Sequence, residues 1–131
     1  GGEVRYLLDT HALLWWMTDD PQLSSRARKL IADERNNILV SAASAWEIAT
    51  KHRLGKLPIA AVAIPSFNEL VVADGFEHLP VTYLHALRAG SFQIEHRDPF
   101  DRMLAAQSAL EAAPLITRDP VFAAFGVNTV W

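Results

Sequence analysis

The stretch Tyr6-Leu7-Leu8-Asp9-Thr10-His11 is a short apolar run that ends abruptly at a carboxylate. Residues 4–8 are rich in strand-forming side chains and too few for a helix, so they predict a buried strand. Residues 12–17 have helical length and contain no turn residue. Asp9 is therefore expected at a strand-to-helix junction, which is where open α/β sheets bind their ligands.

The rest of the chain continues this alternation of strands and helices. Further strands are predicted at residues 38–40, 114–116 and 127–130, and a short strand at residues 76–81. Helix starts are predicted at Ser24 or Ser25, Ser41 or Ser44, Pro65, Thr82, Asp98 and Asp119. Because the strands are apolar on both faces, the sequence predicts an α/β fold. We expect a single domain, residues 1–131, with a parallel sheet of about five strands sandwiched by helices.

Length, charge and cysteine content limit the classes of function. A chain of 131 residues, half of them hydrophobic, is long enough for one core and short for two. The net charge of −3 argues against tight sequence-specific DNA binding, yet it is compatible with a nuclease whose metal ions contact the phosphate. The absence of cysteine excludes disulfides and thiolate chemistry and is typical of a cytoplasmic protein.

Membrane insertion and secretion are not expected. No apolar run approaches the roughly 20 residues that a membrane span needs. The first residues, Gly1-Gly2-Glu3, lack the basic segment and apolar core of a signal peptide, and we expect the two glycines to be a cloning scar.

Four aspartates have an ordinary structural explanation at helix starts. Asp9, Asp98 and Asp119 each suit the N-cap position of a helix. Asp101 lies in the first turn of the helix that Asp98 would cap, where an acid complements the helix dipole. Since one cap is enough for that helix, Asp101 is the better site candidate of the two.

Glu47 also has a structural explanation. It can complete a capping box with Ser44, and it can pair with Lys51 four residues later. Its other neighbours, Trp46 and Ile48 among them, are apolar. A carboxylate within such an apolar segment is not expected to be simply solvated.

The acids together indicate a site, because Asp9, Glu47 and Asp119 all follow predicted strands. Parallel strands bring such junctions to one edge of the sheet. Two carboxylates 4 Å apart repel each other by about 4 kcal/mol at an effective dielectric constant of 20, so a cluster requires positive charge. A hard divalent cation, Mg²⁺ or Mn²⁺, suits oxygen ligands best. The rival explanation, without a metal, is pairing with nearby arginines, namely Arg97, Arg102 and Arg118.

Other chemistry is weakly supported. The five histidines show no zinc-binding spacing, so each is expected at the surface or in packing. The chain has neither a phosphate-binding glycine loop nor a GxSxG motif. Trp15, Trp16 and Met17 are consecutive and cannot all face one core, so part of this helix is expected to meet a partner or a second copy.

Four segments, in this order and spacing, carry a resemblance to a known family. They are LLDTHALLWW near the start, SAASAWEIATKHRLGKL in the second β-α unit, HRDPFDRMLAAQ in the third block and LITRD near the end. With them, essentially the whole chain resembles the PIN domains, and among these the VapC-type toxins of bacterial toxin–antitoxin pairs. The resemblance implies a parallel sheet flanked by helices and a Mg²⁺- or Mn²⁺-dependent endoribonuclease, usually dimeric and silenced by a cognate antitoxin.

The resemblance also implies the site residues. Matched residue by residue, the acidic quartet of the family falls on Asp9, Glu47, Asp101 and Asp119, which would be both catalytic and metal-binding. Thr117 falls on a supporting position that often carries a small hydroxyl or amide side chain. Asp98 lies outside the quartet and is expected to be a helix cap. No member of the quartet is missing, so we expect an active enzyme.

The expected reaction is hydrolysis of an RNA phosphodiester bond by water that the bound cations activate. The expected target is a single-stranded loop of RNA. Five basic residues are candidates for contacts with the substrate's phosphates, namely Lys51, Arg53, Arg97, Arg102 and Arg118. Two alternatives remain open: a structure-specific DNA nuclease, and a non-catalytic module whose acids cap helices and whose Trp15 and Trp16 hold a protein partner.

Overall fold

The structure, a computed structural model, describes residues 4–131 apart from the side chains of Val62, Ser66 and Leu70. Gly1-Gly2, the expected cloning scar, lies outside the described residues. Within them, five strands form one fully parallel sheet in the order β3-β2-β1-β4-β5. The strands are β1 (Val4–Leu8), β2 (Asn36–Ser41), β3 (Glu77–Leu79), β4 (Leu115–Ile116) and β5 (Thr129–Val130). The predicted parallel α/β fold with about five strands is confirmed.

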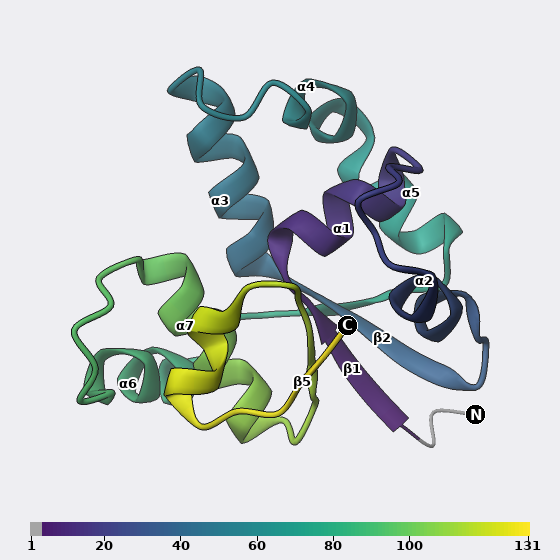
Figure 1. The fold of residues 1–131 in the computed structure, drawn as a ribbon. Coiled ribbons are helices and arrows are strands. Elements are labelled where there is room, and N and C mark those ends of the chain that lie inside the picture. The colour runs from purple at the N-terminus through teal and green to yellow at the C-terminus, as the bar shows by residue number, and fades with distance from the viewer. Residues whose placement is uncertain (1–3) are drawn as a thin grey trace.

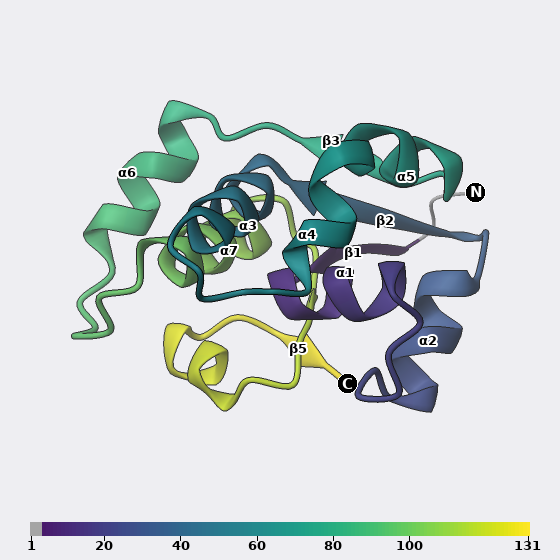
Figure 2. The same cartoon turned by 90° about the horizontal axis from the view of Figure 1, so that it is seen from above.

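Helices cover both faces of this sheet (Figures 1 and 2). The α-helices are α1 (Thr10–Met17), α2 (Ser25–Ala32), α3 (Ala42–Arg53), α4 (Ala60–Ala63), α5 (Phe67–Ala73), α6 (Tyr83–Ser91) and α7 (Pro99–Leu110). Two 3₁₀ helices complete the set, η1 (Ile64–Ser66) and η2 (Pro120–Phe125). In the part of the chain that the structure describes, no helix is both long and apolar enough to span a membrane.

The hydrophobic core has two halves, one on each face of the sheet. Side chains of α1, α2, α4 and α5 pack with Leu8, Ile38 and Val40 on one face. On the other face, side chains of α7 and η2 pack with Leu7 and Leu39. Because neighbouring residues of a strand point to opposite faces, both halves need apolar residues, which explains the continuous apolar runs in the sequence.

The structure decides one open choice of helix start and moves another helix start from its expected residue. Ser41, not Ser44, caps α3, because Ser41 Oγ accepts a hydrogen bond from Ala43 N at 2.9 Å. The capping box proposed for Ser44 and Glu47 is therefore wrong, and Glu47 lies in the second turn of the helix. The helix expected from Pro65 instead begins at Ala60 and passes through η1 before α5.

The exposed tryptophan face expected on α1 is not found. Trp15 is only 8% exposed and packs in the core, with its ring edge-on to Trp131 at 5.9 Å between centroids. Trp16 is half-buried, packs on Phe76 and donates a hydrogen bond to Asp74 Oδ2 at 3.1 Å. The idea that Trp15 and Trp16 hold a partner is therefore withdrawn.

Candidate active site

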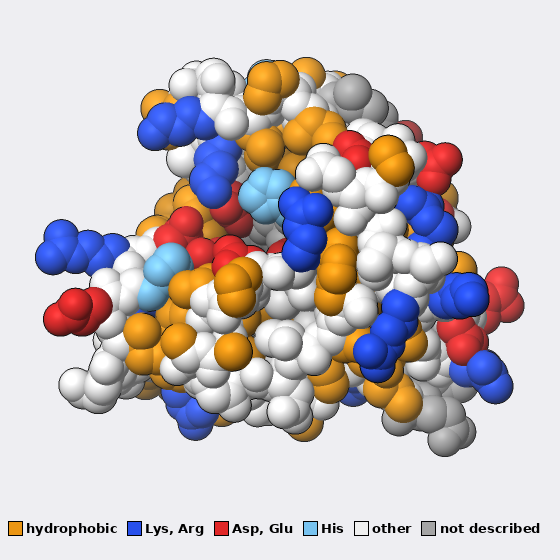
Figure 3. Space-filling model, in the orientation of Figure 1, with side chains coloured by type: hydrophobic (Ala, Val, Ile, Leu, Met, Phe, Trp, Pro, Cys, Tyr) orange, Lys and Arg blue, Asp and Glu red, His pale blue; other side chains and the backbone are white. Residues whose placement is uncertain are grey.

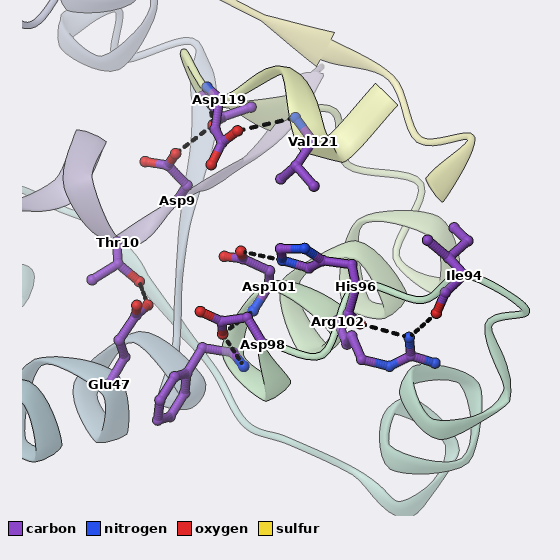
Figure 4. A network of polar contacts seen from close by, with 12 residues as sticks. Asp9, Thr10, Glu47, Ile94, His96, Asp98, Asp101, Arg102, Asp119 and Val121 are labelled. Carbon is purple, nitrogen blue, oxygen red and sulfur yellow. Dashed lines mark hydrogen bonds and ion pairs between the residues drawn. The ribbon is translucent and has the colours of Figure 1, made fainter. Parts of the chain in front are cut away.

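The expected acids come together at the carboxyl edge of the sheet, where α1 and α3 leave β1 and β2 (Figure 1). Asp9, Glu47, Asp101 and Asp119 all line one cavity of about 750 Å³. Figure 3 shows red acidic side chains gathered in a hollow, with blue and pale blue basic side chains at its rim. In Figure 4, the carboxylates of Asp9, Glu47 and Asp101 extend toward the same space. The predicted convergence of these four residues is thus what the fold produces.

Asp9 is a buried carboxylate held by two hydrogen bonds. It caps α1, because its Oδ1 accepts from Ala12 N at 2.6 Å, and its Oδ2 accepts from the Thr117 hydroxyl. Burial raises the pKa of Asp9 to about 6, although these two hydrogen bonds and the nearby His11 oppose the rise and Asp101 adds to it. The folded protein thus disfavours the charge on Asp9.

Thr117 links two acids of the quartet. Its hydroxyl donates to Asp9 and accepts a hydrogen bond from Asp119 N at 3.0 Å. Asp119 itself is exposed and caps η2, with its Oδ1 accepting from Val121 N at 3.0 Å. The supporting position expected for Thr117 is thus a buried hydrogen-bonding position beneath the cavity.

Glu47 is 3% exposed and has both oxygens engaged. Its Oε1 accepts from the Thr10 hydroxyl, which also lies 3.1 Å from Ser44 Oγ, and its Oε2 pairs with Lys51 Nζ. The pair expected between Glu47 and Lys51 therefore exists, at the wall of the cavity. Lys51 offsets the charge of a buried carboxylate, so it is part of the site and not a free surface lysine.

Asp101 is half-buried in the first turn of α7. Burial raises its pKa, and the carboxylates of Asp98 and Glu47 add to this, while a hydrogen bond with His96 opposes it. His96 Nε2 lies 2.8 Å from Asp101 Oδ2. The sequence did not single out His96, because it lies in a loop with no helical register to Asp101. Only its place five residues before a candidate acid could have drawn attention to it.

Asp98 has the capping role expected of it. Its Oδ1 accepts from Phe100 N at 2.9 Å and from Asp101 N at 3.1 Å, so it begins α7 and fixes the turn that carries Asp101. Its side chain also lines the cavity.

The five basic candidates divide by position. Lys51 and Arg118 line the cavity, whereas Arg53 and Arg97 are exposed residues outside its lining. In the residues that the structure describes, none of the three arginines proposed as partners of the acids forms an ion pair with the quartet. The rival explanation based on those arginines is therefore not what the structure shows.

Arg102 has a different role from the phosphate contact expected of it. Its guanidinium points away from the carboxylates in Figure 4 and donates to five backbone carbonyls, two in the last turn of α6 and three in the segment between α6 and α7. These carbonyls belong to Ala89, Gly90, Phe92, Ile94 and His96. Arg102 thus holds the loop that carries His96.

We expect Arg102→Lys to destabilise the fold by about 2 kcal/mol, because an ammonium cannot reproduce a planar set of hydrogen bonds and leaves carbonyls without a donor. Urea unfolding checks this value. Arg53→Lys, at an exposed position on α3, is the control and should stay within about 0.5 kcal/mol of the wild type. If both variants unfold like the wild type, the five hydrogen bonds do not secure this loop.

The donor set suits a hard divalent cation. The cavity offers carboxylate oxygens, and the pKa values of Asp9 and Asp101 are both raised by burial and by neighbouring acids. Among the described residues, no three acids or histidines already lie close enough together to enclose an ion. Mg²⁺ does not require such a cage, since it commonly keeps several waters and uses one or two carboxylates. Asp9 and Asp101 fit that requirement.

Comparison with known proteins agrees with this fold. The PIN domain family model matches residues 6–128. Ribonuclease VapC16 of Mycobacterium tuberculosis (strain ATCC 25618 / H37Rv) is 57% identical over an alignment 42 residues long, which covers 29% of this chain and 30% of that protein. The match thus spans less than a third of the length of this curated relative.

A solved structure resembles nearly the whole chain. It is a chain of the crystal structure of VapBC2 from Rickettsia felis bound to a DNA fragment from their promoter. The two structures superpose with a TM-score of 0.70 over 98% of both chains, and their sequences are 16% identical. At this identity the match is evidence for the fold alone. The resemblance seen in the sequence is confirmed by these findings. Because the family model spans nearly the whole chain, this protein belongs to the PIN domain family.

Proposed function

We propose that this protein is a metal-dependent endoribonuclease toxin of the VapC type, kept inactive by a cognate antitoxin. The observation that carries the proposal is the single cavity lined by Asp9, Glu47, Asp101 and Asp119. The segment shared with Ribonuclease VapC16 supports RNA as the substrate, and the likeness to a VapBC2 chain supports an antitoxin as the partner. Two further expectations, a homodimer and a cytoplasmic location, stay predictions.

In this proposal Asp9 and Asp101 hold a Mg²⁺ or Mn²⁺ ion, with Glu47 and Asp119 completing the acidic lining. When bound, such an ion polarises a phosphate oxygen and lowers the pKa of a coordinated water. The protein's own residues fix the geometry: Thr117 orients the carboxylate of Asp9, and His96 orients that of Asp101.

Charge balance assigns roles to the remaining groups. Lys51 offsets Glu47, which leaves a net negative cavity that attracts cations and repels phosphate until a cation is bound. Arg118, at the cavity lining, is then the basic residue best placed to meet the substrate. Arg53 and Arg97 remain candidates for contacts with more distant phosphates.

A non-catalytic module is the second candidate, because Asp9, Asp98 and Asp119 are all observed as helix caps. Capping does not account for Glu47, which lies in the middle of α3 and needs Lys51 and Thr10 to be accommodated. Nor does it explain why capping acids should share a cavity with two others. We therefore favour the nuclease.

Cleavage of labelled oligonucleotides tests the proposal. We expect a single-stranded RNA to be cut at defined positions in Mg²⁺ or Mn²⁺ and not in EDTA, and a DNA of the same sequence to stay intact. The variant Asp33→Asn, at an acid outside the cavity lining, should cut like the wild type. Cutting of the DNA instead would indicate the DNA nuclease. The absence of cutting in any metal would favour the binding module.

A further inference from the structure

Arg118 is a cavity-lining arginine held in place by neutral side chains. Its Cζ lies 4.5 Å from the centre of the Trp15 ring, and its Nη2 donates to Gln22 Oε1 at 3.3 Å. It forms no ion pair with any side chain that the structure describes, although Asp119 is its neighbour in the chain. The guanidinium is therefore positioned without being neutralised.

The support beneath Arg118 is rigid. Trp15 is buried, with the rings of Trp131 and His11 packed against it at centroid distances of 5.9 Å and 5.6 Å. A guanidinium stacked on such a ring has lost much of its side-chain freedom before any ligand arrives, which lowers the entropic cost of binding. Trp15 is also on the helix that Asp9 caps, so the acid and the support belong to the same element.

The cavity extends from the acids to this stack. Trp15, Gln22 and Arg118 line the same cavity as Asp9, and so do two apolar side chains from the segment before α4, Leu57 and Ile59. One face of the guanidinium is covered by Trp15, while the Arg118 side chain as a whole is exposed. Because Arg118 stays exposed although Trp15 lies against its Cζ, the guanidinium keeps surface for a planar ligand, and proteins that bind single-stranded RNA stack bases on arginine planes.

We propose that Arg118 is a nucleobase-binding residue, whose outer face stacks with the base of a nucleotide next to the cleaved phosphodiester bond. Trp15 and Gln22 are positioning residues, since they fix the plane of the guanidinium. Leu57 and Ile59 contribute apolar surface to the same cavity. This inference rests on the proposed ribonuclease function and adds a subsite to it.

The test measures binding of a short single-stranded RNA, made with an uncleavable linkage at its mapped cleavage position, by fluorescence anisotropy in Mn²⁺. We expect Arg118→Lys to weaken binding about tenfold, because lysine keeps the charge and loses the stacking plane. RNAs with one abasic nucleotide at each position in turn locate the base. At one position beside the cleaved bond, the abasic RNA should bind the wild type as weakly as the variant binds intact RNA. The two changes together should weaken binding no further.

Two controls sharpen the result. Arg26→Lys changes an exposed arginine of α2 outside the cavity lining and should leave binding within about twofold of the wild type. Gln22→Ala removes one hydrogen bond at an exposed position, and we expect it to weaken binding about threefold while the melting temperature is kept.

The outcomes separate the two claims. If the wild type neither binds nor cuts RNA, the proposed function fails, and the subsite with it. If the wild type cuts RNA but Arg118→Lys binds it equally well, Arg118 acts at most as a point charge and the subsite is overturned. The subsite is also overturned if, at every abasic position, the loss of binding from the missing base simply adds to the loss from Arg118→Lys.

Discussion

Asp9→Asn is expected to abolish RNA cleavage and, in metal-free buffer at pH 8, to make the protein more stable. Burial raises the pKa of Asp9 from an ordinary 3.8 to about 6, so the folded state prefers the neutral carboxyl. Above about pH 6 the wild type carries a charge that folding disfavours, and by linkage this costs about 3 kcal/mol. Asparagine removes the charge and is as good an N-cap.

The pH dependence of this gain has a definite sign. As pH rises from about 4 through 6, the unfolded wild type has already lost its Asp9 proton while the folded protein loses it later, so wild-type stability falls. The advantage of Asp9→Asn should therefore be absent at pH 4 and reach about 2 kcal/mol at pH 8, allowing for the hydrogen bond that the Thr117 hydroxyl loses when the amide oxygen of asparagine stays on Ala12 N. Thermal unfolding of both proteins in EDTA across this pH range measures the difference in stability as a function of pH.

Asp98→Asn is the matched control, because Asp98 is also an N-cap that lines the cavity. It should show no comparable gain between pH 4 and 8. Adding Mn²⁺ should raise the melting temperature of the wild type and of Asp98→Asn more than that of Asp9→Asn. A loss of stability in Asp9→Asn at pH 8 would instead identify Asp9 as a charged cap and favour the non-catalytic module.

Local sequence patterns were enough to predict most of the fold. The abrupt change from Leu8 to Asp9 predicts the end of β1, and Asp98-Pro99 predicts the start of α7, because caps and strand ends depend on neighbouring residues. The parallel order then follows from the alternation of strands and helices. Predictions of the shortest elements were less accurate: the strand expected at residues 76–81 covers only Glu77–Leu79.

The contacts that complete the site were beyond sequence reasoning, because they join distant segments. Thr10 reaches Glu47 from another helix, and Thr117 reaches Asp9 across two adjacent strands. The same limit explains the error over Trp15: three consecutive bulky residues suggest exposure, but Trp131 and Arg118 cover this ring from other parts of the chain. Spacing within one helix cannot reveal such partners.

Lys51→Met is expected to destabilise the metal-free protein by about 2 kcal/mol, the second large effect. Glu47 is almost fully buried, with 5% of its side chain exposed, and Lys51 is its cationic partner. Removing one member of a buried ion pair leaves the other uncompensated, which costs about 3–5 kcal/mol. The Lys51 side chain is 29% exposed, so water screens the pair and reduces the figure. Urea unfolding in EDTA measures it.

A second substitution separates the charge effect from lost packing. Methionine keeps the aliphatic stem near Phe100, and Glu47→Gln removes the unpaired charge while keeping an acceptor for Thr10. The double variant should therefore regain most of the lost stability, whereas Lys56→Met, at an exposed lysine just after α3, should change it little. A double variant as unstable as Lys51→Met would show that packing, not charge, is responsible.

Mn²⁺ should partly replace the missing ammonium. In the wild type, Lys51 occupies one oxygen of Glu47, so an ion that uses this carboxylate must compete with it. In Lys51→Met that oxygen is free and the cavity is more negative, and cation binding should tighten. The stability deficit of the variant should accordingly shrink as Mn²⁺ is added, and isothermal titration should show a lower dissociation constant than for the wild type. A deficit that Mn²⁺ leaves unchanged would place the cation out of reach of Glu47, with Asp9 and Asp101 as its remaining ligands.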